Sequence, residues 1–129
     1  MVTTTGVHHI TLIVRDLKKS KEFYQNVCGM EVVHDEEDVC GLTDGMFSLW
    51  LAHSHEIIAK DDVFNSEKLG LNHWAFRVDT QEDLDEIEEA LRKMEIEMEE
   101  GGITDDGYGG TAIFTKDPDG MKVEFHLQE

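Results

Sequence analysis

The sequence predicts an α+β fold in which two tandem βαβββ modules form an open half-barrel around a cavity. The first observation is a repeat: an alternating, strand-like stretch that begins at His9 recurs about half a chain length later at His73. The second is that each copy is followed by a helix-like segment and then by three short stretches with strand patterning. A single domain of 129 residues is therefore expected, with modules at about 7–56 and 71–127.

The first module begins with a strand over residues 7–14, where apolar side chains alternate with others. Asp16 is placed to cap the helix that follows, and Gly29 to end it. Residues 43–45, Thr-Asp-Gly, have the composition of a hairpin turn. Three further strands are predicted at Met30–His34, Val39–Leu42 and Phe47–Ala52.

The second module repeats this order, beginning with a strand over residues 72–78. Thr80 and Asp83 have the spacing of a capping box at the start of an amphipathic helix whose outer face is almost wholly acidic. Residues 54–70 connect the modules, which are expected to pack on each other because a small sheet with one helix buries little apolar area. The remaining strands are predicted at about Glu95–Glu99, Thr111–Thr115 and Lys122–Leu127.

The chain carries 29 acidic against 11 basic side chains, for a formal net charge of −18. Such a field repels nucleic acids and anionic membranes, so neither is an expected partner. The acid lies mainly in residues 34–38 and 82–100, which solvated faces explain as well as a salt-rich cytoplasm would. The sequence shows neither an apolar run of transmembrane length nor a signal peptide, and Cys28 and Cys40 fit reduced thiols, so a cytoplasmic protein is expected.

Three side chains on strands far apart in the sequence are expected to face one concavity. His9 and His73 lie on the opposite face of their strands from the apolar residues that meet the helices, and Glu124 lies likewise on the last strand. A carboxylate buried beside two imidazoles is costly unless a cation holds it, and this set suits a divalent metal with open positions. A lone strand histidine is more often structural, but three matched positions favour a metal site.

These segments resemble the vicinal oxygen chelate superfamily, which includes glyoxalase I, bleomycin-resistance proteins, fosfomycin-resistance enzymes, methylmalonyl-CoA epimerase and extradiol dioxygenases. The resemblance rests on residues 8–17, 72–78 and 117–124 and covers nearly the whole chain. It implies paired modules around a divalent metal (Ni, Zn, Mn or Fe) that chelates a small-molecule substrate through vicinal oxygens. It also implies a homodimer, because modules of this superfamily often pair across two subunits.

The same resemblance implies further candidate residues. Glyoxalase I and the epimerases have one more metal ligand in the first module, at the position aligned here with Leu49, which is not a ligand. His53 shares a strand face with Leu49 and is a candidate for a metal or acid–base role, while Tyr108, in the glycine-rich loop 105–110, is a candidate substrate contact or proton donor. The candidate substrate-binding residues are Thr11, Trp50 and Arg77. Of the other histidines, His8 is expected to point away from His9, His34 and His55 to be solvated, and His126 to lie at the surface or behind the ligands.

The leading functional hypothesis is a metal-dependent lyase or isomerase of glyoxalase type, in which the metal polarises vicinal oxygens of the substrate. The missing acidic residue near Leu49 counts against glyoxalase I itself. One alternative is an Fe(II) extradiol-type dioxygenase, because two His and one Glu match the ligand set of those enzymes. Another is a non-catalytic binding protein of bleomycin-resistance type. Fosfomycin resistance is favoured by the pair His9 and Thr11, and disfavoured because the sequence stops at Glu129 without the basic C-terminal residues of those enzymes.

Overall fold

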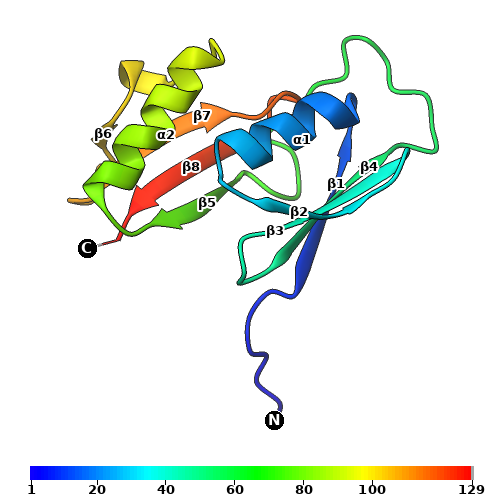
Figure 1. The fold of residues 1–129 in the computed structure, drawn as a ribbon, viewed down its shortest axis with the longest axis horizontal. Helices are drawn as coiled ribbons and strands as arrows, with labels where there is room; N and C mark the ends of the chain where they lie inside the picture. Colours follow the sequence, from blue (N-terminus) through cyan, green and yellow to red (C-terminus); the bar gives the residue numbers. More distant parts are fainter. Residues whose placement is uncertain (129) are drawn as a thin grey trace. The chain divides into compact units, whose positions relative to one another are not determined.

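The computed structural model describes residues 1–128, and Glu129 lies outside them. The chain divides into two compact units, one from Met1 to Lys60 and one that begins at Asp61. Each unit holds one α-helix and one four-stranded sheet, so the predicted pair of βαβββ modules is confirmed (Figure 1). Neither sheet closes on itself, because the two edge strands of each sheet have only one neighbour.

The first half contains β1 (His9–Val14), β2 (Glu31–Asp35), β3 (Val39–Thr43) and β4 (Ser48–His53). The sheet order is β1-β4-β3-β2, with β1 parallel to β4 and the other pairs antiparallel. Three of the four strands match the sequence expectation within one residue at each end. The first begins two residues later than expected, at His9.

Helix α1 (Leu17–Asn26) covers one face of this sheet. Its start is the predicted one: the Asp16 carboxylate accepts a hydrogen bond from the Lys19 N–H at 3.1 Å, which satisfies one of the free donors of the first turn. The helix buries its apolar stripe, and Phe23 and Tyr24 are fully enclosed. The sheet side chains buried with them are Leu12, Val14, Leu49 and Leu51.

The second half repeats the plan with β5 (His73–Val78), β6 (Thr104–Asp105), β7 (Thr111–Lys116) and β8 (Lys122–Leu127). The order is β5-β8-β7-β6, and the only parallel pair in this sheet is again that of the first and last strands. The two sheets therefore have the same topology, which confirms the repeat that the histidine-led segments indicated.

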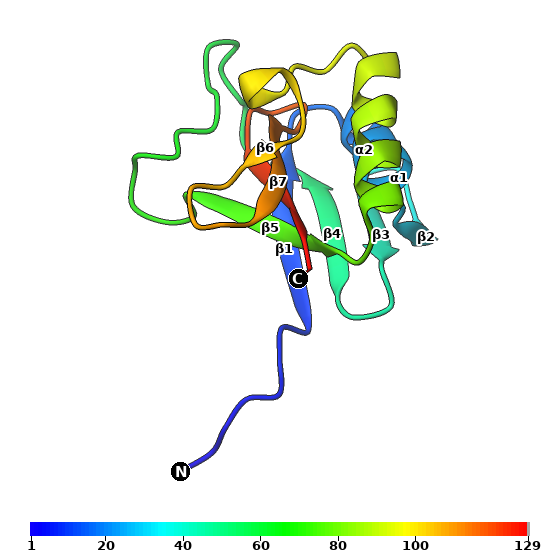
Figure 2. The ribbon, with the colours of Figure 1, turned by 90° about the vertical axis from the view of Figure 1, so that its left-hand side faces the viewer.

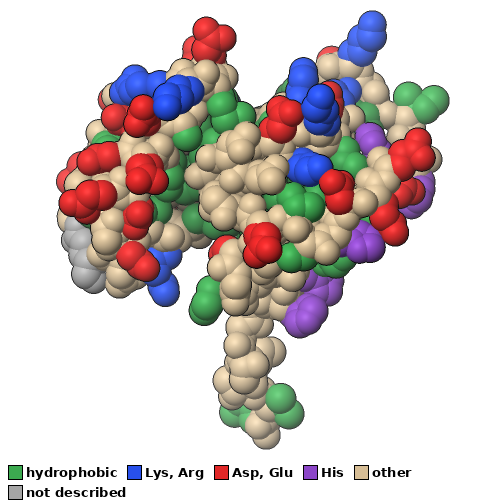
Figure 3. Space-filling view, viewed as in Figure 1, with side chains coloured by type: hydrophobic (Ala, Val, Ile, Leu, Met, Phe, Trp, Pro, Cys, Tyr) green, Lys and Arg blue, Asp and Glu red, His purple; other side chains and the backbone are tan. Residues whose placement is uncertain are grey.

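Helix α2 (Gln81–Lys93) packs on β5, β7 and β8. Figure 2 shows the helix beside the strands of its own unit. The Thr80 hydroxyl accepts from the Asp83 N–H at 3.1 Å, so the predicted cap is confirmed. Leu84 and Leu91, on the inner face of the helix, are fully buried. Figure 3 shows acidic side chains gathered over the surface that carries α2, the outward face opposite this stripe.

The prediction of a strand at Glu95–Glu99 is wrong. Glu95 and Glu100 adopt left-handed backbone conformations, with φ of 57° and 56°, which an extended strand does not allow. A 3₁₀ turn, η1 (Glu99–Gly101), occupies the end of this segment, and one bridge between Met98 and Thr115 is its only ladder contact. The edge strand β6 forms instead at Thr104–Asp105 and is only two residues long.

Within residues 1–128, no helix combines the length and the apolar character needed to cross a bilayer.

Candidate metal-binding site

The second half brings His73 and Glu124 together. His73 begins β5 and Glu124 lies in the middle of the neighbouring parallel strand β8, where it pairs with Ala75. Both side chains lie on the sheet face opposite α2, and His73 Nε2 is 3.4 Å from Glu124 Oε2. Glu124 is only 9% exposed, so its carboxylate has lost most of its water and depends on neighbouring donors or a cation.

Asn72 fixes the state of the His73 ring. The His73 Nδ1 lies 2.8 Å from the Asn72 side-chain oxygen, while the Asn72 amide group donates to the Ser66 carbonyl at 2.9 Å. Because an amide oxygen only accepts, Nδ1 carries the proton in this arrangement, and in the neutral ring the lone pair is on Nε2, the atom beside Glu124. A hydrogen bond on the second ring nitrogen is the arrangement that orients metal-binding histidines.

The first half holds its histidine in a similar way. His8 Nδ1 and His9 Nδ1 are 2.8 Å apart, and the two rings meet edge to face with centroids 5.1 Å apart. The expectation that His8 points away from His9 is therefore wrong. His8 precedes β1, so its side chain does not have to point to the opposite face from that of His9, as it would within a strand. His8 and Asn72 occupy the same place in the repeat, and each leaves the Nε2 of the following histidine available.

A cavity of 220 Å³ opens beside His73 and Glu124. Its walls include Asn72 and Lys122, and Lys122 lies on the same face of β8 as Glu124, two residues earlier. The Lys122 ammonium brings positive charge to a cavity that two carboxylates, those of Glu99 and Glu124, also border. The cavity is large enough for a small molecule of a few heavy atoms.

A neutral imidazole nitrogen and a buried carboxylate oxygen are suitable donors for a divalent cation, so these residues fit two positions of a metal site. Among residues 1–128, no three His, Cys, Asp or Glu side chains are grouped closely enough to hold a metal. His9, the third expected ligand, belongs to the first half and is exposed at the start of β1.

The strand register changes the assignment of the position equivalent to Glu124. Glu124 pairs with Ala75, two residues after His73, and the residue that pairs with Thr11, two after His9, is Trp50. Trp50, not Leu49, is therefore the counterpart of Glu124. The indole of Trp50 packs across Gly41 of β3, where an added Cβ would lie 2.8 Å from the ring, so this neighbour has to be glycine.

His53 lies on the other face of the first sheet from His9. It pairs with the buried Val14 and shares its strand face with Leu49 and Leu51, the face that α1 covers. The side chain borders a hollow of 410 Å³ whose other walls include the basic side chains of Arg15, Lys18 and Lys21. The predicted acid–base role would require the opposite face, and we leave His53 out of the candidate site.

The other sequence candidates lie on the open faces of the two sheets. Thr11 and Trp50 flank each other on the face of His9, and Arg77 pairs with His126 on the face of His73. Tyr108 stands at the tip of loop 105–110 and is 95% exposed.

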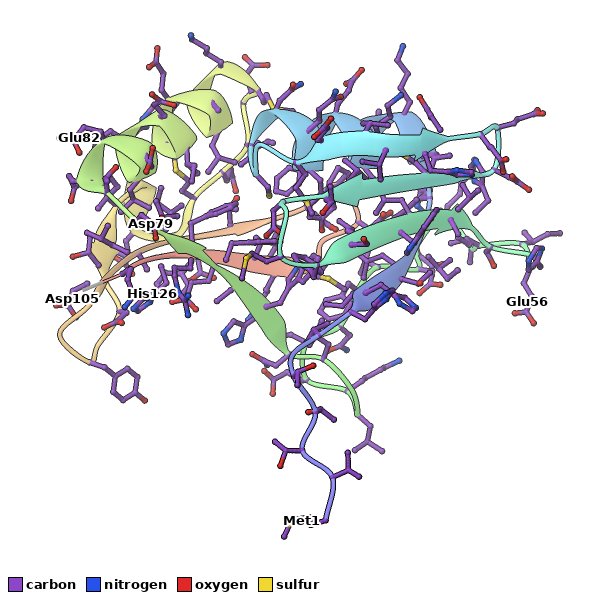
Figure 4. The ribbon with its side chains drawn as sticks, turned by 60° about the horizontal axis from the view of Figure 1, so that its bottom comes forward. Met1, Glu56, Asp79, Glu82, Asp105 and His126 are labelled. Carbon is purple, nitrogen blue, oxygen red and sulfur yellow. The ribbon has the colours of Figure 1, made fainter. Side chains whose placement is uncertain are left out.

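Sequence reasoning missed the extent of the polar contacts around Glu124. His126 Nδ1 is 3.1 Å from Glu124 Oε1 and 3.5 Å from Asp106 Oδ2. Hydrogen bonds from the Tyr108 and Gly110 N–H groups, followed by the charge of His126, lower the pKa of Asp106. The signal available in the sequence was a histidine two residues after the carboxylate, on the same strand face. Figure 4 shows His126 on the side of the second sheet opposite Glu82 of α2.

The family described as the Glyoxalase/Bleomycin resistance protein/Dioxygenase superfamily matches residues 6–125. A metallothiol transferase FosB of Lysinibacillus sphaericus is 31% identical over 128 residues, which are 97% of this chain and 84% of that protein. A glutathione transferase FosA of Serratia marcescens is 30% identical over 125 residues, covering 95% of this chain and 80% of the relative.

The fold has close counterparts among solved structures. A glyoxylase/bleomycin resistance protein/dioxygenase domain from Frankia sp. superimposes with a TM-score of 0.83 at 24% identity, over 98% of this chain and 94% of that one. The sequence match and the matching fold together cover both βαβββ halves. The chain therefore belongs to the glyoxalase/bleomycin resistance protein/dioxygenase superfamily.

Proposed function

We propose that this protein is a divalent-metal-dependent enzyme that transfers a thiol to a small, oxygen-bearing electrophile. The observation that carries the proposal is the His73–Glu124 pair, which opens on a cavity of 220 Å³ bordered by Lys122. The proposed metal ligands are His9, His73 and Glu124. The curated relatives that are named as metallothiol and glutathione transferases favour thiol transfer among the reactions of the superfamily.

The chain's own residues would bind and orient the substrate. Lys122 would attract an anionic group to the cavity, and Thr11, Trp50, Arg77 and Tyr108 are the proposed contacts on the open faces of the two halves. A bound divalent cation would supply Lewis acidity to the substrate oxygens. With an epoxide, the thiol sulfur forms a bond to one ring carbon as that carbon's bond to oxygen breaks, and the proton lost by the thiol ends on the released oxygen.

A glyoxalase-type isomerisation is the second candidate, favoured by the same ligand pair and cavity. It requires a residue that moves a proton between neighbouring carbons of the substrate. Where the second half has Glu124, the first half has Trp50, whose indole neither binds a metal nor transfers a proton at neutral pH. This difference makes isomerisation less well supported than thiol transfer.

We further propose that the protein works as a homodimer. Light scattering of the purified chain would measure the assembly. Mixing a His9→Ala variant with a His73→Ala variant then tests where the ligands come from: recovered metal binding in the mixture means that the two halves of one site belong to different subunits.

The reaction is tested on protein stripped of metal and reloaded with Mn(II), Ni(II), Zn(II) or, anaerobically, Fe(II). Each form is given three substrates: fosfomycin (a small epoxide phosphonate) with glutathione or cysteine, the hemithioacetal of methylglyoxal, and a catechol with oxygen. We expect metal-dependent thiol consumption that Glu124→Gln abolishes. Turnover of only the hemithioacetal would assign the isomerase, and oxygen uptake with catechol the dioxygenase. Metal binding without any turnover would favour a binding protein, and the absence of metal binding would overturn the proposal.

A further inference from the structure

The two oxygens of the Glu124 carboxylate have different surroundings. Oε1 lies 3.1 Å from His126 Nδ1, and Oε2 lies 3.4 Å from His73 Nε2. The His126 contact is a hydrogen bond, whereas the His73 contact is longer, and a neutral His73 ring with its proton on Nδ1 has only a lone pair on Nε2. His126 therefore provides the hydrogen bond to the carboxylate, and it holds Oε1, the oxygen that is not beside His73 Nε2.

His126 is itself held from the other side by the glycine-rich loop. Its Nδ1 lies 3.5 Å from Asp106 Oδ2, and Asp106 Oδ1 accepts from the N–H groups of Tyr108 and Gly110 at 2.7 and 2.9 Å. An added Cβ at Gly110 would lie 2.4 Å from Asp106 Oδ2 and 3.0 Å from His126 Cε1. A side chain at this position would press on both groups, so glycine leaves the room in which Asp106 lies against His126.

The same ring nitrogen thus faces one carboxylate of strand β8 and one of loop 105–110. Both carboxylates accept when ionised, so Nδ1 is the donor; Glu124 Oε1 at 3.1 Å is its hydrogen-bond partner, and Asp106 Oδ2 is a more distant negative charge at 3.5 Å. Resting on the metal site proposed above, we propose that His126 is a positioning residue: anchored by Asp106, it fixes Oε1 of Glu124 and leaves Oε2 beside His73 for the metal. His126 differs in this from His73, whose Nε2 lies beside the other carboxylate oxygen, Oε2.

The physical reason is the burial of Glu124. A carboxylate with little access to water turns toward whichever donors remain, and losing the His126 donor would leave Oε1 without its hydrogen bond. The carboxylate would then reorient, and the donor geometry offered to a cation would become less favourable. A hydrogen bond to a ligand from outside the coordination sphere typically changes metal affinity by about 10- to 100-fold.

The test compares Mn(II) affinity, measured from the electron paramagnetic resonance signal of free Mn(II), in the wild type and four variants. His126→Phe removes the donor, and His126→Asn places an amide donor near the position of Nδ1. Asp106→Asn weakens the anchor. His34→Phe is the matched control, since His34 forms the same kind of contact, 3.3 Å from Glu36 two residues away, in the first half.

We expect His126→Phe to weaken Mn(II) binding at least tenfold, His126→Asn to restore most of it, and His34→Phe to leave it unchanged. In the metal-free protein, His126→Phe should also speed amide exchange at Tyr108 and Gly110, whose N–H groups Asp106 holds. Equal Mn(II) affinity in wild type and His126→Phe would overturn the inference and leave the proposed function intact. If the wild type binds no metal, the proposed function itself falls and this inference with it.

Discussion

The two halves of this protein share one topology and differ at one decisive position. In the second half, β8 carries Glu124 opposite the residue two places after His73. In the first half, β4 carries Trp50 opposite the residue two places after His9. The neighbours differ accordingly: Glu124 is flanked by His73 and His126, and Trp50 packs on Gly41 and meets the ring of His34 at 5.4 Å. The duplicated fold thus provides two equivalent positions, and only one of them carries a side chain that is able to bind a metal.

The difference lies in the open faces, whereas the covered faces are alike. Leu49 and Leu51 in β4 occupy the places of Val123 and Phe125 in β8, and all four are buried under their helix. Both halves therefore bury the same strand positions, and the candidate metal ligands lie on the other face. The comparison predicts that substitutions on the covered face of a strand will lower stability, and that substitutions on the open face of the same strand will change metal binding.

The largest expected effect is on stability, from Leu49→Ala. Leu49 is fully buried beneath α1, and removing a buried leucine side chain costs about 2–5 kcal/mol of unfolding free energy. Denaturant unfolding would measure the loss, with Ile13→Ala, an exposed position on the opposite face of the neighbouring strand, as the control. A change of Mn(II) affinity in folded Leu49→Ala, without a loss of stability, would contradict the separation of the two faces. It would favour Leu49 over Trp50 as the counterpart of Glu124.

The next largest effect is on metal binding, from Glu124→Gln. The substitution keeps the size of the side chain and removes the charge, so Mn(II) affinity should fall by more than the roughly 100-fold typical of a lost second-shell contact. Trp50→Phe, at the equivalent position of the first half, should leave the affinity unchanged. Calorimetric titration of both variants checks this, and a comparable loss in Trp50→Phe would show that the two positions are not as different as the register indicates.

A smaller effect is expected at the residues that precede the two histidines. Asn72→Leu removes the acceptor that fixes the His73 tautomer, and we expect a loss of Mn(II) affinity of about tenfold. His8→Asn gives the first half the residue type found in the second and should preserve binding. Nitrogen chemical shifts of the His73 ring would report the tautomer directly, and an unchanged ring in Asn72→Leu would contradict this role.

Local chemistry made much of this fold predictable from sequence. Asp16 and Thr80 cap their helices as expected, because the capping interaction involves only residues three positions apart. That His73 and Glu124 lie on the sheet face opposite the helix followed from strand alternation. The assignment of Leu49 failed because turn motifs do not fix the register between strands, and only the observed pairing identifies Trp50.

Two other features depended on information that a pattern of residue types does not carry. The strand expected at Glu95–Glu99 is absent because Glu95 turns the chain through a left-handed conformation directly after α2, at a residue type that rarely adopts it. The contact between Asp106 and His126 joins a loop to a strand and is invisible until Gly110 is seen to allow the close approach.

The smallest expected effect is a difference in how the halves respond to pH. In the second half, the N–H groups of Tyr108 and Gly110 lower the pKa of Asp106, so its stabilising contribution is complete above the ordinary carboxyl value of 3.8 and is lost as pH falls through the lowered pKa. In the first half, the hydrogen bond to Asp35, at 2.5 Å, raises the pKa of Lys21, whose contribution is complete below 10.5 and is lost as pH rises through the raised pKa. Acid should therefore loosen loop 105–110 first, and alkali should first loosen the contact between α1 and β2. Amide exchange measured across both pH ranges would show this. Asp106→Asn should remove only the response to acid, and Lys21→Met only the response to alkali. If either variant lost both responses, the two halves would not titrate independently.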